Sequence, residues 1–180
     1  MRFRRHLVLT EQGIIKGHLK TEGRRLSTFL NNTVRPFLEM EESSLVSSTR
    51  GQDASPHSML LNRNEILLAH EMEETGDDGL RQLAELLRDE VAVTAHFSGV
   101  VELQVTGNVG KRAMDRCASG QQVFIVLAEP RFRCPAGEAS EQCSILEGLP
   151  YVILNTRRLN FLSVKAREEE AGRSFREPLQ

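Results

Sequence analysis

The sequence predicts a mainly β protein with short helices, of the α+β class, made of two tandem small β-barrel-like or β-sheet units joined by an amphipathic helix. Three observations predict it: short apolar and β-branched runs bounded by glycine turns, a similar stretch late in each half, and a leucine-striped segment between the halves. The predicted boundaries are a first unit over 1–71, an acidic linker and helix over 72–90, a diverged second unit over 91–165 and a polar tail over 166–180.

The two similar stretches are LLNRNEIL at 60–67 and ILNTRRLN at 153–160. Their alignment places Asn62 on Asn155, each directly after an apolar run. An asparagine at a strand end commonly closes a tight turn with its side chain. We favour this role for both residues over the alternative, in which the two amides contact a ligand at equivalent places.

The preceding segments match in the same order. PFLEMEESSL at 36–45 aligns with VFIVLAEPRF at 123–132, with Phe37 on Phe124 and Glu42 on Glu129. Each unit then reads as strand, strand, short helix, strand, long loop and strand; two unrelated β segments with generic patterning are the alternative. Two further pairs of strands match upstream: LVLT (7–10) with VAVT (91–94), and GIIKGHL (13–19) with GVVELQV (99–105), the latter followed by a predicted turn at Thr106-Gly107-Asn108.

Short helices are predicted between the second and third strands of each unit. RRLSTFLNN at 24–32 falls opposite KRAMDRCAS at 111–119, where Leu26 and Met114, then Phe29 and Cys117, share a helical spacing. Between the units, LRQLAELLRDE at 80–90 carries four leucines on one stripe after an acidic, glycine-containing linker.

Composition and charge restrict the function. The chain has 180 residues, 39% hydrophobic and 27% charged, with a formal net charge of -2, which is typical of a soluble globular protein and provides no overall attraction to nucleic acid. No apolar run is long enough to span a membrane, and the one after the basic start is too short for a signal peptide, so we expect a cytoplasmic protein without membrane contact. Three cysteines without a CxxC pair (Cys117, Cys134 and Cys143) are expected to be simple buried or loop residues, with a structural disulfide or a metal site as the alternative.

The first unit resembles an uncharacterised family of small bacterial β domains. The residues that carry the resemblance lie within about 5–71: Gly17-His18-Leu19, Gly23-Arg24-Arg25-Leu26-Ser27, Leu30-Asn31, Phe37 and Leu61-Asn62-Arg63-Asn64-Glu65-Ile66. The second unit lacks the Arg-Leu-Ser helix start and the Leu-Asn pair. The resemblance implies no activity, and a small barrel of Sm-like kind is an analogy of topology.

Catalytic and metal-binding patterns are weak. The five histidines show no metal-ligand spacing, so no metal or other cofactor is predicted. Gly107 to Lys111 faintly resembles a phosphate loop, but a turn before a helix explains it better. An enzyme would need a pocket that joins at least two of His18, His96, Glu39 and Glu41, and a solvated strand face accounts for the two glutamates. The chain is therefore predicted not to be an enzyme.

Basic residues recur at similar places in the two units. They are predicted as a possible binding surface: Arg24, Arg25, Lys111, Arg112, Arg157 and Arg158. With one tyrosine and no tryptophan, the chain offers few platforms for stacking bases. The leading prediction is therefore a non-catalytic interaction or assembly module that binds another protein or itself, with a homodimer as one form. The alternative is an RNA-binding protein with paired Sm-like barrels.

Overall fold

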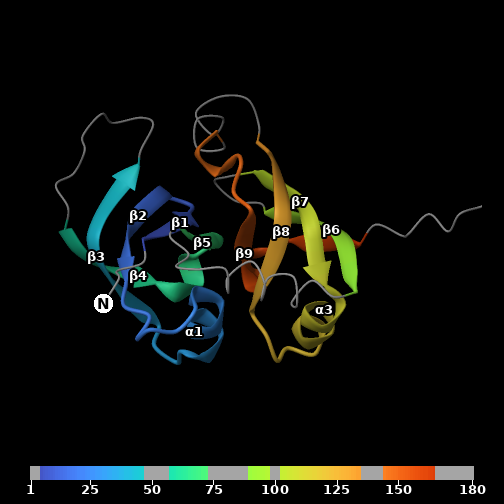
Figure 1. The fold of residues 1–180 in the computed structure, drawn as a ribbon, viewed down its shortest axis with the longest axis horizontal. Helices are drawn as coiled ribbons and strands as arrows, with labels where there is room; N and C mark the ends of the chain where they lie inside the picture. Colours follow the sequence, from blue (N-terminus) through green and yellow to red (C-terminus); the bar gives the residue numbers. More distant parts are fainter. Residues whose placement is uncertain (1–4, 47–56, 73–88, 98–101, 135–143, 165–180) are drawn as a thin grey trace, which may run out of the picture.

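A computed structural model describes residues 5–46, 57–72, 89–97, 102–134 and 144–164. Within these ranges the chain is mainly β, with ten antiparallel strands in one sheet (Figure 1). The predicted interunit helix at 80–90 and the polar tail lie almost wholly outside these residues. No helix in the described ranges is long and apolar enough to cross a membrane.

The two halves of the chain share a set of elements in the same order, and the second half has in addition a short helical segment at 144–146, between its third and fourth strands. The first half is β1 (His6–Thr10), β2 (Gly13–Leu19), α1 (Leu26–Asn32), β3 (Phe37–Val46), β4 (His57–Asn62), η1 (Arg63–Glu65) and β5 (Leu68–Glu71). The second half is β6 (Glu90–Phe97), β7 (Leu103–Gly110), α3 (Lys111–Ala118), β8 (Phe124–Arg133), β9 (Tyr151–Asn155), η2 (Thr156–Arg158) and β10 (Phe161–Val164).

The order of strands within the sheet is also the same in both halves. Across the sheet it is β10-β6-β7-β8-β9-β5-β1-β2-β3-β4, so β9 and β5 join the halves while β10 and β4 are the outer strands. In Figure 1 the first half lies on the left and the second on the right, with β9 between them. The sequence predicted either barrel-like or sheet-like units. The described strands form one open sheet, without the pairing that would close a barrel.

The long third strand of each half is bent by a bulge. Glu42 in β3 and Glu129 in β8 both have a positive φ, 47° and 49°, where the pairing register with the preceding strand shifts. A glycine of the preceding strand faces each bulge. A Cβ at Gly17 would lie 2.9 Å from the Glu41 carbonyl oxygen, and a Cβ at Gly107 would lie 2.5 Å from the Ala128 carbonyl oxygen. Only glycine allows this close approach of the two backbones.

Three predictions about the strands are corrected. Each half has a fifth strand, β5 or β10, which follows the 3-10 turn after Asn62 or Asn155. Strand β7 spans Leu103–Gly110 rather than 99–105, so the predicted turn and the glycine-lysine segment at 107–111 are the end of a strand and the start of α3. The register also equates His6 with Val93, because each pairs with the glycine that faces a bulge. The alignment of LVLT with VAVT is off by three residues, because short apolar strands carry little information on register and the pairing partners that fix it are distant in the sequence.

The cysteine prediction is also corrected in part. Cys117 in α3 is a free, half-buried thiol, whereas Cys134, just after β8, is disulfide-bonded. An odd number of cysteines without a CxxC pair does not indicate a disulfide. Because disulfides are rare in the reducing cytoplasm, the cytoplasmic location stays a prediction.

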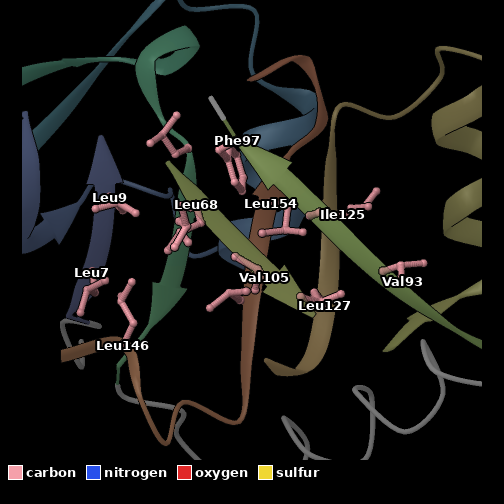
Figure 2. Close-up of a cluster of buried hydrophobic side chains, with 14 of the residues drawn as sticks. Leu7, Leu9, Leu68, Val93, Phe97, Val105, Ile125, Leu127, Leu146 and Leu154 are labelled. Carbon is pink, nitrogen blue, oxygen red and sulfur yellow. The ribbon is translucent and has the colours of Figure 1, made fainter. Parts of the chain in front are cut away.

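Two hydrophobic cores lie on opposite faces of the central strands, and both halves contribute to each. The first contains Leu7, Leu9 and Leu68 of the first half beside second-half residues such as Leu127 and Leu154 (Figure 2). The second surrounds α1 and includes three residues of the second half, Phe124, Tyr151 and Ile153. Strands β1, β5 and β9 are consequently buried along their whole length. Neither half encloses its core alone.

We predict that Leu154→Ala lowers the free energy of unfolding by ~2–5 kcal/mol, since it leaves a cavity at a fully buried position opposite Leu68. Urea denaturation followed by circular dichroism measures the change. Val34→Ala, at an exposed loop position, is the control and is expected within about 0.5 kcal/mol of the wild type. Equal midpoints for the two variants would contradict the shared core.

Candidate interaction surface

The two halves meet at a junction formed by β5, β9 and the side chains packed around them. The strands pair antiparallel, with Leu68 opposite Leu154 and Ala69 opposite Ile153. Asn155 extends this pairing: its backbone N–H donates to the Leu67 carbonyl at 3.0 Å, and its Nδ2 donates to the Ile66 carbonyl at 2.9 Å. A buried asparagine that forms these bonds fixes the register of the two strands.

Asn31, near the end of α1, forms a second link across the junction. Its Oδ1 accepts the backbone N–H groups of Val123 and Phe124, at 3.1 and 2.9 Å, and its Nδ2 donates to the Phe124 carbonyl at 2.8 Å. One side chain thereby binds three main-chain groups at the start of β8. Nothing in the Leu30-Asn31 pattern of the sequence showed that its partner would be the other half.

Charged residues line the side of the junction where η1 and η2 meet. Arg63 donates from Nε to the Leu30 carbonyl at 2.9 Å, and its guanidinium carbon lies 5.2 Å from the centre of the Phe124 ring. Partial burial, and then the positive charge of Arg157, lower the pKa of Arg63. Arg158 forms ion pairs with Glu11 and Glu65. Arg63 was not among the predicted binding residues.

The six predicted basic residues lie in three separate places. Arg24 and Arg25 precede α1, and Arg24 lies 3.9 Å from the Glu22 carboxylate. Lys111 and Arg112 are exposed at the start of α3, which Figure 1 shows on the other half from α1. Arg157 and Arg158 belong to η2 at the junction. The structure thus brings Arg157 together with Arg63 rather than with the helix starts.

Asn62 and Asn155 both cap a 3-10 turn. The Oδ1 of Asn62 accepts from the Asn64 N–H at 3.0 Å, and that of Asn155 accepts from the Arg157 N–H at 3.1 Å. This is the turn-closing arrangement favoured from the sequence. Asn155 additionally binds across the junction, while Asn62 lies on the outer strand β4.

The histidines and carboxylates considered for catalysis have other contacts. Lys20 Nζ lies 2.8 Å from both Glu39 and Glu41, and His18 Nε2 lies 3.2 Å from Glu42. His96 lies in the other half, where its ring stacks on Phe161 with centroids 4.1 Å apart. Within the described ranges, no three histidine, cysteine, aspartate or glutamate side chains are grouped to hold a metal.

The outer strands carry exposed apolar side chains. On the β4 side these are Leu60, on β4 itself, and Phe37, which pairs with Asn62 from β3. On the β10 side they are Phe161 and Val164. These four account for most of the large hydrophobic side chains exposed within the described ranges; the others are Val34 and Met72.

Comparisons with protein-family models, curated proteins and solved structures found no match to this chain. The resemblance to small bacterial β domains therefore stays a prediction.

We predict that Asn31→Ala destabilises the protein by ~1–3 kcal/mol, because it removes the partners of three main-chain groups at the junction. The neighbouring Asn32 is exposed on the same helix, so Asn32→Ala is a matched control for the change in helix propensity. Thermal and urea unfolding of both variants measure the difference. Equal stabilities would show that the Asn31 contacts add nothing to the junction.

Proposed function

We propose that this protein is a non-catalytic assembly module, built from a duplicated small β unit, whose two outer strands bind protein partners. One observation carries the proposal: the open sheet ends on both sides in a strand that bears exposed apolar side chains. An unprotected strand edge presents unpaired N–H and C=O groups to which another strand can add. Apolar side chains along such an edge favour association further.

The duplication is supported by the matching order of elements and strands in the two halves. The glycine-faced bulges at Glu42 and Glu129, and the turn caps of Asn62 and Asn155, fall at matching places. The bulges in β3 and β8 interrupt the pairing register at matching places, as is expected of two copies of one unit.

The non-catalytic part of the proposal is supported by the contacts of the candidate groups. Lys20 forms ion pairs with both Glu39 and Glu41, and His18 and His96 belong to different halves. These side chains do not converge on one reacting centre, as an acid and base pair must.

RNA binding is the second candidate function, and the pair Arg63 and Arg157 favours it. The two residues lie on the 3-10 turns η1 and η2, which contact each other, and a phosphate at this place would attract both guanidinium groups. Against it, Arg158 is already paired with two carboxylates, and the chain carries a net charge of -2.

The test is capture of proteins from a lysate of the source cells by the tagged full chain. The double variant Leu60→Lys/Phe161→Lys places a charge on each outer strand and should lower the recovery of specific proteins by roughly tenfold or more. Val34→Lys, an exposed loop position, is the charge-matched control and should capture as the wild type does. Each capture is run with and without nuclease.

Recovery that is lost with nuclease, falls steeply with salt and is unaffected by the double variant would overturn the assembly proposal and favour RNA binding. In that case Arg157→Ala should weaken RNA binding more than Arg24→Ala does.

A further inference from the structure

The pairing registers establish which positions of the two halves correspond. Phe37 lies opposite Asn62 in the first half, as Phe124 lies opposite Asn155 in the second. Leu9 lies opposite Leu68, as His96 lies opposite Phe161. Strand β4 therefore corresponds to β9, and β5 corresponds to β10.

This correspondence describes the junction in general terms. Where β9 meets β5, the fourth strand of one half pairs with the fifth strand of the other. The outer strands are the remaining members of the same two kinds, since β4 is a fourth strand and β10 is a fifth. The sheet thus ends on one side with a fourth strand and on the other with a fifth strand, the two kinds of strand that pair at the junction.

The exposed apolar side chains at the two outer edges of the sheet, on β4 and β10 and at the start of β3, stand at positions whose counterparts are buried at the junction. Phe37 is 52% exposed while Phe124 is 1% exposed, Leu60 is 71% exposed while Ile153 is 1% exposed, and Phe161 is 55% exposed while Leu68 is fully buried. Val164, also exposed, corresponds to the buried Glu71. Side chains that the junction covers inside the chain are thus left uncovered at its two ends.

We propose that chains of this protein associate head to tail, with β10 of one chain pairing antiparallel to β4 of the next. The occupant of each outer strand is a second copy of this chain, which rests on the proposed assembly function and names its partner. By correspondence with the junction, Phe161 lies opposite Leu61 of the next chain, and Leu162 lies opposite Leu60. Asn62 repeats the bonds of Asn155, donating from its backbone N–H to the Asn160 carbonyl and from Nδ2 to the Leu159 carbonyl of the neighbouring chain.

The contact between chains lacks one part of the junction. The Val123 N–H donates to Asn31 at the junction. Val123 corresponds to Pro36, because the Thr156 N–H donates to the Val123 carbonyl as the Arg63 N–H donates to the Pro36 carbonyl. Proline has no N–H, so a clamp of the Asn31 kind cannot form there in full. The association is accordingly weaker than the internal junction and depends on protein concentration.

A head-to-tail contact joins two different surfaces, and this makes it testable with two single variants. Leu60→Lys blocks the β4 surface and leaves β10 intact, while Phe161→Lys does the reverse. Each variant alone should be monomeric at concentrations where the wild type forms rings or filaments. An equimolar mixture should form a dimer and nothing larger, because only one intact surface of each kind is present. Sedimentation velocity and light scattering of the full chain measure the masses, and circular dichroism checks the fold.

Val34→Lys is the control and should assemble like the wild type. A second measurement uses cysteines at the proposed register: Leu60→Cys mixed with Leu162→Cys should give an interchain disulfide, whereas Val34→Cys mixed with Leu162→Cys should not.

Two results would overturn the proposal: a wild type that is monomeric at all concentrations, or one variant that still dimerises alone, which would indicate pairing of like strands. If the wild type is monomeric but capture from lysate still requires Leu60 and Phe161, the assembly function stands and only the identity of the partner is wrong. If the variants also capture as the wild type does, both proposals fail.

Discussion

The pairing of β5 with β9 is the interaction on which the rest of the structure depends. These are the strands that carry one continuous sheet from one half of the chain to the other, and their side chains alternate between two cores. Leu68 and Leu154 face one core, while Ala69 and Ile153 face the other. Loss of this pairing would expose both cores at once, and the buried amide of Asn155 would lose its acceptor on Ile66.

The order of elements divides the chain into two halves, whereas the burial of hydrophobic side chains does not. By order of elements the chain divides into two similar halves, and each half has its own helix, bulge and capped turn. By burial it has no boundary in the middle, because Leu7 and Leu9 pack with second-half residues, while Phe124 and Tyr151 pack around the first-half helix. Neither of the two similar halves therefore buries a core by itself.

The sequence predicted the features that depend on local chemistry. The alignments of Phe37 with Phe124 and of Asn62 with Asn155 agree with the pairing registers, because apolar strands and asparagine-capped turns have recognisable residues. The fifth strands were missed because LAHE and FLSV are short and do not alternate, and β5 is buried on both faces. The Arg63 and Asn31 contacts join residues distant in the sequence, and no local pattern indicates such pairs. The binding role of the six basic residues stays a prediction, and their distribution over three places follows from the tertiary fold, which no local pattern shows.

The contact of Asn31 with β8 has a consequence for how this protein can vary. All three of its bonds end on main-chain atoms, so the clamp recognises the path of the backbone and not the identity of the side chains at 123 and 124. Those two positions can change their residues freely with respect to the clamp, as long as neither becomes proline. A covariation analysis of homologous sequences would therefore find no signal between position 31 and its partners, although the contact joins the two halves of the molecule.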